Sequence, residues 1–141
     1  MPRLTALLLA VSLAVVPLRT TAEERDSLFT DYADYSAYVD RMLTTRAWAD
    51  FILRMGGRDE YTPQQLTKIA ADFDAIYPAA FTQRTLFREV DLGGGIRQEA
   101  RAYWNGGSYL FYYAILHQRD DALVVLNFSM NSKIEPVMAR F

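Results

Sequence analysis

The spacing of apolar residues changes near residue 80, and this change most constrains the fold. Before it, apolar side chains recur every three or four residues, which is typical of amphipathic helices. After it, they alternate with other residues, and aromatic and β-branched side chains become frequent, as in β-strands. Helices that come first and strands that follow predict an α+β fold, with the helices packed on one face of a curved antiparallel sheet.

Three helical stretches are expected before the change. The first has one apolar face, formed by Leu28, Tyr32, Tyr35, Val39 and Met42. The second covers residues 48–55 and ends at Gly56-Gly57. The third has the clearest start signal, because Thr62-Pro63-Gln64-Gln65 combines an N-cap threonine, a proline at the first helical position and the glutamine of a capping box.

Four strands are expected over residues 81–92, 96–104, 108–117 and 122–130. The links between them are short, and Asn105-Gly106 is a strong hairpin signal because type I′ turns need positive φ at both central residues. Consecutive strands with short links are antiparallel neighbours. The sequence therefore predicts a four-stranded meander, and the tail at 134–141 is a candidate fifth strand.

The Asn105-Gly106 hairpin also assigns side chains to the two faces of the sheet. Small residues on one strand lie opposite large rings on the next, which is good complementarity for a packed surface. We expect the helices to cover this face, which carries Ile96, Gln98, Ala100, Ala102, Trp104, Tyr109, Phe111, Tyr113, Ile115 and His117.

The other face is polar on its second strand but would leave an apolar patch in water. The patch consists of Leu110, Tyr112, Leu116, Leu123 and Val125. Soluble monomers seldom expose a large apolar surface. Two alternatives account for it: the C-terminal tail covers the patch, or a second copy of the chain forms a homodimer through it.

Residues 1–22 have the layout of a secretory signal peptide. Arg3 precedes an uncharged apolar run, and small residues lead to an expected cleavage site after Ala22. We therefore expect an exported protein, periplasmic or extracellular, with a single α+β domain over residues 23–141. A retained membrane anchor is the alternative, but the run would span only about 20 Å as a helix, against about 30 Å of hydrocarbon core.

Composition excludes several classes of function. The formal net charge is −2 and no Lys/Arg run occurs, so neither nucleic acid nor, after cleavage, a membrane is an expected partner. The chain has no cysteine, which excludes disulfides, thiol catalysis and thiolate metal sites. A single histidine, His117, cannot build a multi-histidine metal site, and we expect no cofactor.

The helix at 63–77, the strands at 81–130 and the Asn105-Gly106 hairpin together resemble the NTF2-like, or cystatin-like, α+β superfold. The resemblance implies that helices and a curved sheet enclose a conical pocket. Members of this superfold include small isomerases and hydrolases as well as exported binding or accessory domains. The commonest order places a strand between the helices, and residues 58–61 are too polar for one. The resemblance does not choose between binding and catalysis.

The favoured function is an exported binding or accessory domain without catalytic activity. Its candidate ligand is a small apolar molecule held between the helices and the sheet. The candidate binding residues share the face expected to be covered, and they are Gln98, Trp104, Tyr109, Phe111 and Tyr113.

The alternative function is a small isomerase or hydrolase with an acid–base pair at the pocket mouth. If Gly93-Gly94 forms a two-residue turn, Glu89 and Asp91 share one end of the sheet face with His117. A carboxylate would then act as base, and the imidazole or a tyrosine hydroxyl as proton donor. A three-residue glycine loop instead turns both carboxylates to the other face.

Overall fold

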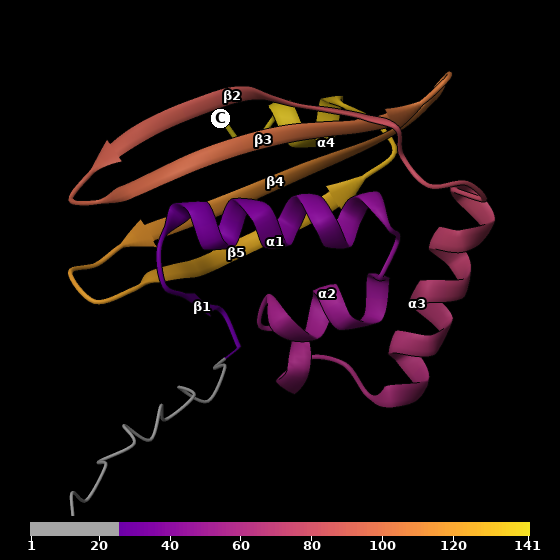
Figure 1. Cartoon of the computed structure of the whole chain (residues 1–141), viewed down its shortest axis with the longest axis horizontal. Coiled ribbons are helices and arrows are strands. Elements are labelled where there is room, and N and C mark those ends of the chain that lie inside the picture. The colour runs from indigo at the N-terminus through magenta and orange to yellow at the C-terminus, as the bar shows by residue number, and fades with distance from the viewer. Residues whose placement is uncertain (1–25) are drawn as a thin grey trace, which may run out of the picture.

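In the computed structural model, which describes residues 26–141, helices come first and long strands follow (Figure 1). The α+β class predicted from the change in spacing is confirmed. The expected signal peptide lies outside the described residues. In chain order the elements are β1 (Leu28–Phe29), α1 (Tyr32–Thr44), α2 (Trp48–Arg54), the 3₁₀ turn η1 (Gly57–Asp59), α3 (Pro63–Ile76), β2 (Gln83–Gly93), β3 (Ile96–Asn105), β4 (Ser108–Gln118), β5 (Leu123–Asn131) and α4 (Glu135–Met138).

The three expected helical stretches form α1, α2 and α3, except that Leu28 lies in β1, and side chains cap the starts of α1 and α3. The Asp31 carboxylate accepts the backbone N–H of Asp34 at 2.9 Å at the start of α1. At the start of α3, Thr62 Oγ1 accepts the N–H of Gln65 at 3.2 Å, and Gln65 Oε1 accepts the N–H of Thr62 at 2.8 Å. This is the predicted capping box, and it provides partners for N–H groups that a helix start leaves unpaired.

The β3–β4 hairpin has the predicted assignment of residues to faces. The strands pair from Asn105 opposite Ser108 to Ile96 opposite His117. Gly106 in the turn has a φ of 58°, a conformation that glycine adopts without steric cost. The turn chemistry therefore specifies which residues of the two strands lie side by side.

The fifth strand comes from the N-terminal side of the described chain. The antiparallel sheet has the order β1-β5-β4-β3-β2, and Leu28 in β1 pairs with Val124 at the edge of β5. The tail, which was the candidate for this strand, forms the short helix α4 instead, with Pro136 in its first turn. Proline is tolerated at a helix start, where its missing N–H would have no partner.

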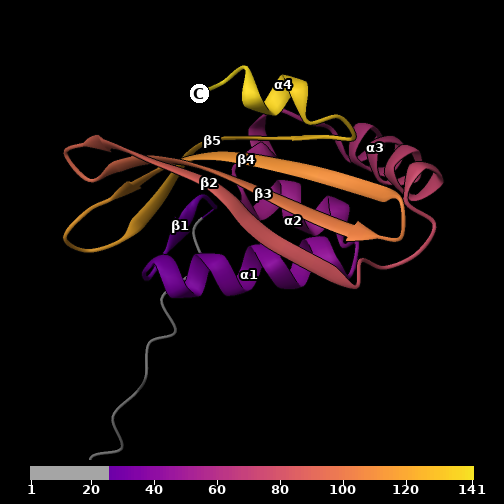
Figure 2. The same ribbon diagram turned by 90° about the horizontal axis from the view of Figure 1, so that it is seen from above.

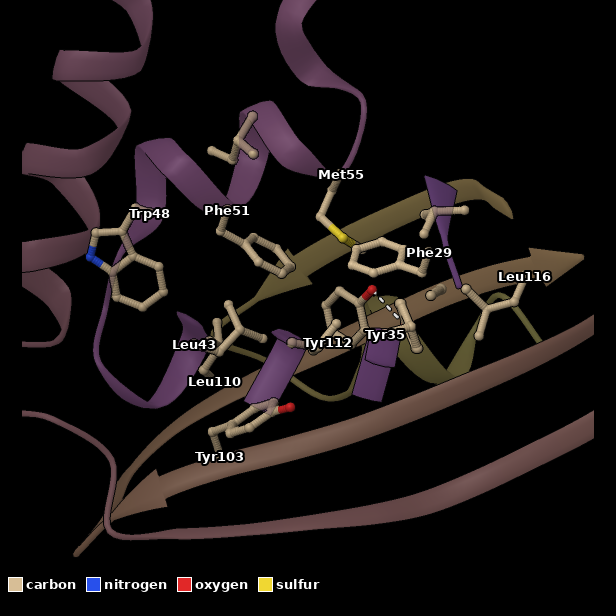
Figure 3. Packing of buried hydrophobic residues seen from close by; sticks show 14 of the residues in the cluster. Phe29, Tyr35, Leu43, Trp48, Phe51, Met55, Tyr103, Leu110, Tyr112 and Leu116 are labelled. Carbon is tan, nitrogen blue, oxygen red and sulfur yellow. Dashed lines mark hydrogen bonds between the residues drawn. The ribbon is translucent and has the colours of Figure 1, made fainter. Parts of the chain in front are cut away.

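Helices α1, α2 and α3 cover one face of the sheet, which we call the inner face. It is the face opposite to the one expected to be covered. Tyr103, Leu110, Tyr112 and Leu116 are fully buried there, and the Tyr112 ring meets the Phe51 ring of α2 edge to face at 5.9 Å (Figure 3). The expectation that the face of Phe111 lies beneath these helices is wrong.

A bulge in β5 also changes which side chains of that strand face the helices. Leu116 pairs with Val125, but its neighbour Ile115 pairs with Asn127, so Leu126 is left without a partner. An extra residue in one strand shifts the alternation of faces by one position. A simple period of two therefore fails along β5, although it holds along β3 and β4.

Short α4 covers part of the opposite face, which we call the outer face (Figure 2). Val137 of α4 is 1% exposed and packs with Ala100 and Tyr113 in a second small core. The Phe141 ring meets the Tyr113 ring edge to face, with centroids 5.4 Å apart. The tail therefore packs on the outer face and not on the expected apolar patch.

The five residues of that expected patch belong to the main core. Leu110, Tyr112, Leu116, Leu123 and Val125 lie beneath the helices and are at most 5% exposed. The α1–α3 layer shields them from water, so no second mechanism is needed to cover them. In this fold a second copy has no access to them, and the argument for a homodimer through these residues no longer applies.

Candidate functional site

The glycine turn between β2 and β3 decides where the predicted acid–base residues lie. Gly94 and Gly95, with φ of 62° and 80°, form a two-residue turn in a conformation that glycine adopts readily. Gly93 pairs with Ile96, and a register shift follows in β2, so Asp91 pairs with Arg97 rather than with Gln98. The shift sends the β2 carboxylates to the inner face.

Glu89 and Asp91 consequently lie on the face opposite to His117. Glu89 pairs with Glu99 on the inner face, whereas His117 pairs with Ile96 on the outer face. Side chains on opposite faces of a sheet cannot reach one substrate. The structure does not bring the predicted carboxylates and imidazole together, so this acid–base pair is not assembled.

Three of the predicted ligand-binding residues form a row of stacked rings on the outer face. The ring centroids of Trp104 and Tyr109 are 5.7 Å apart, and their planes differ by 15°. Those of Tyr109 and Phe111 are 5.8 Å apart, with planes 8° apart. Both spacings are within the range of favourable aromatic pairs. Tyr109 is 41% exposed, so the row is open to solvent.

The other two predicted binding residues, Gln98 and Tyr113, hold the C-terminal end of the chain. Gln98 Nε2 donates to the Tyr113 hydroxyl at 2.8 Å and to the Arg140 carbonyl at 2.9 Å. The Arg140 guanidinium lies 5.2 Å from the centroid of the Tyr113 ring. Tyr113 is only 1% exposed, so both side chains serve to fasten the tail to the sheet.

An open groove, which we call the outer groove, lies beside the row of rings. Tyr109 and Phe111 line one side, and residues 132–136, which lead into α4, line the other. The groove is shallow and open to solvent, with a volume of about 650 Å³. Ile134 on its rim is 38% exposed. The outer groove thus presents aromatic and aliphatic side chains to solvent.

A buried network of charges lies on the inner face, and the sequence analysis missed it. Glu99 is fully buried and Arg101 is 4% exposed, and Arg101 Nε donates to Glu99 Oε1 at 2.7 Å. From α1, the hydroxyls of Tyr32 and Tyr35 donate to Glu99 at 2.8 and 2.9 Å. A buried ion pair is tolerated when further hydrogen bonds satisfy its remaining atoms in this way.

Asp40 connects this network to the surface. Its Oδ1 accepts from Arg101 Nη1 at 3.1 Å and from the Tyr103 hydroxyl at 2.7 Å. Its Oδ2 accepts from Arg84 Nε at 3.0 Å, and the Arg84 side chain is 58% exposed on β2. A continuous series of polar contacts therefore runs from buried Glu99 to solvent.

Burial raises the pKa of four tyrosines in this region, Tyr32, Tyr35, Tyr103 and Tyr112. The main cause is the loss of water around the phenolate, which would be charged. Their hydroxyls consequently stay protonated at neutral pH and can donate hydrogen bonds to Glu99, Asp40 or one another. The network is thus suited to holding carboxylates in place, and none of these tyrosines supplies a phenolate base.

One feature of the sequence could have indicated the network. Arg97, Glu99 and Arg101 alternate along β3, which is a pattern typical of a solvated face. Their neighbours on β4 are apolar, however, since Glu99 pairs with Ala114 and Arg101 with Tyr112. When charged residues on a central strand lie beside apolar residues on the next strand, there are two explanations. Either the faces have been assigned wrongly, or the charges are buried together with oppositely charged or hydrogen-bonding partners.

No protein-family model, curated protein or solved structure matches this chain. Within residues 26–141, no group of three or more His, Cys, Asp and Glu side chains is arranged to hold a metal ion. None of the helices formed by these residues is both long and apolar enough to cross a membrane. The fold, the grooves and the buried network are therefore the features that bear on function.

Proposed function

We propose that the protein is an exported binding domain without catalytic activity, and that it holds a small apolar ligand in the outer groove. The observation that carries the proposal is the row of stacked rings formed by Trp104, Tyr109 and Phe111, of which Tyr109 and Phe111 line an open groove of about 650 Å³. Aromatic side chains supply large contact area with little loss of rotamer freedom, which suits them to binding.

The ligand's place differs from the one expected between helices and sheet. On the inner face, Tyr112 and Leu116 are fully buried against the helices, so side chains fill that space. The aromatic residues that suggested a ligand are on the outer face, where only short α4 covers the sheet. A ligand there would contact Tyr109 and Phe111 from the solvent side.

An NTF2-like or cystatin-like relationship remains part of this proposal. Helices followed by an antiparallel meander support it, and non-catalytic binding domains occur in that superfold. The enzyme alternative lacks its acid–base pair, because Glu89 and His117 lie on opposite faces of the sheet. Binding is therefore the function that the described residues favour.

A titration with the neutral fluorescent dye N-phenyl-naphthylamine tests the proposal. We expect its fluorescence to rise on binding, and we expect Tyr109→Ala to weaken binding about tenfold, since a buried aromatic contact contributes 1.4 kcal/mol or more to affinity. Tyr61→Ala is the matched control, because Tyr61 is similarly exposed at 37% but is not part of the groove lining. Equal binding by the two variants would contradict the proposed site.

A further inference from the structure

A second groove lies between α1 and the start of β2, on the inner-face side of the molecule. It encloses about 700 Å³ and adjoins a smaller hollow of about 350 Å³ toward β3. The two share Tyr32, Ser36, Asp40 and Arg84 in their lining. We call the combined space the α1–β2 groove; it is separate from the outer groove and shares no lining residue with it.

The walls of the α1–β2 groove are largely apolar and formed by small side chains. Ala33, Ser36 and Ala37 line its α1 side, and small residues on this side of the helix leave room for a ligand. Leu86 of β2 lines the smaller hollow and is 43% exposed. The middle of the α1–β2 groove can thus accept an apolar group of moderate length.

Two guanidinium groups with unused donors border the α1–β2 groove. Arg84 donates from Nε to Asp40. Among the described residues this is the hydrogen bond of its guanidinium, so the N–H groups of its two terminal nitrogens are available to a ligand. Arg41 lies over the Tyr38 ring at 5.4 Å from the centroid and has no carboxylate partner among residues 26–141. Both arginines line the larger hollow.

Arginines outnumber carboxylates in the lining of the α1–β2 groove. Asp40 is the acidic residue in its lining, and both of its oxygens are engaged by Arg84, Arg101 and Tyr103. Glu99 pairs with Arg101 from beneath. The positive charge of Arg41 and the free edge of Arg84 therefore face the groove without a compensating carboxylate from the described chain.

We infer that the α1–β2 groove binds a small amphiphilic carboxylate, with its acid group between Arg41 and Arg84 and its apolar chain along Ala33, Ala37 and Leu86. A guanidinium presents parallel N–H donors that match the two oxygens of a carboxylate. The network holds Arg84 through Asp40, so its side chain is positioned before the ligand arrives. This inference is independent of the ligand proposed for the outer groove.

The test uses sodium octanoate as the probe and octanol as its uncharged counterpart, with amide shifts followed by NMR on residues 23–141. Octanoate is expected to shift amides of α1 and of the first half of β2, and to bind more tightly than octanol. Removing one charged hydrogen-bonding partner should weaken octanoate binding about tenfold. Arg84→Gln and Arg41→Gln are therefore expected to weaken it to this degree, and higher salt to weaken it further.

Arg119→Gln is the matched control, because Arg119 is an exposed arginine whose Nε lies 3.4 Å from Asp121 in the β4–β5 turn. It should leave octanoate binding unchanged. If Arg84→Gln fails to fold, Arg41→Gln still decides, since Arg41 is exposed on α1. The inference is overturned if octanoate does not bind, if octanol binds equally well, if both variants bind normally, or if the shifts gather around Tyr109 and α4.

Discussion

Arg101 and Glu99 point to the same side of β3, and the Nε of one lies 2.7 Å from the Oε1 of the other beneath helix α1. Neither side chain is more than 4% exposed. Two charges removed from water in this way depend on each other, because removing either one leaves the other buried without its closest ion-pair partner. This pair consequently provides a sensitive test of the fold.

Removing one member of the pair should destabilise the protein strongly. We expect Arg101→Met to lower the free energy of unfolding by about 3–5 kcal/mol, since it removes the closest cation of the buried Glu99 carboxylate and leaves Arg97, whose Nη2 lies 3.8 Å away, as its ion-pair partner. The double variant Arg101→Met with Glu99→Leu should recover much of this loss. Urea denaturation gives these values; Arg119→Met, which removes an exposed ion pair, should change stability by less than about 1 kcal/mol.

Adjacent residues on β4 should differ in their sensitivity to truncation. Leu110 is fully buried on the inner face, whereas Phe111 is half-buried on the outer face. Leu110→Ala should cost about 2–5 kcal/mol, and Phe111→Ala clearly less despite its larger side chain. Thermal or urea unfolding of both variants measures the difference. A greater loss for Phe111→Ala would mean that the helices cover the other face.

Alkaline pH should unfold the protein through its buried tyrosines. Burial raises the pKa of Tyr77 to about 12 and also raises the pKa of Tyr35, whereas the unfolded value is about 10. Because the folded state holds these protons more tightly, the contribution of these tyrosines to stability is constant below about pH 10 and falls as pH rises toward 12. We expect the tyrosinate absorbance of these buried residues to appear together with the loss of circular dichroism. A protein that stays folded while all of its tyrosines ionise would contradict this.

The export proposal makes a direct prediction about mass. Protein recovered from the exported fraction of an expressing cell should lack residues 1–22 and begin at Glu23. Intact-mass measurement detects this difference at once. Recovery of a chain that still contains Met1 to Ala22, or its retention in the membrane fraction, would favour an uncleaved anchor.

Local chemistry made several elements predictable. Thr62 and Gln65 specify the start of α3 because their side chains cap neighbouring backbone groups. Gly106 likewise favours the turn of the β3–β4 hairpin, since it adopts a positive φ of 58° without steric cost. In each case the residues that determine the helix start or the turn lie within a few positions of it. The amino-acid sequence of that short segment is therefore enough to predict the element.

The assignment of faces failed because its causes are distant in sequence. Glu99 and Arg101 resemble residues of a solvated strand, and the groups that make their burial tolerable, such as the hydroxyls of Tyr32 and Tyr35, are more than 60 positions away. The bulge at Leu126 causes a second error, in the assignment of β5 side chains to faces. No residue type near Leu126 predicts the bulge. The aromatic row was therefore found by sequence reasoning, whereas the network beneath α1 was not.

The pairing of Leu28 with Val124 has a consequence for how the chain folds. The first and last strands are neighbours, so the sheet is completed only when nearly the entire domain is available. Contacts between such distant positions form slowly because a long loop must close before they are made. In a chain that is synthesised or translocated from its N-terminus, β1 is therefore available before β5. The backbone groups of β1 that pair with β5 stay unpaired until residue 124 has emerged from the ribosome or the translocation channel.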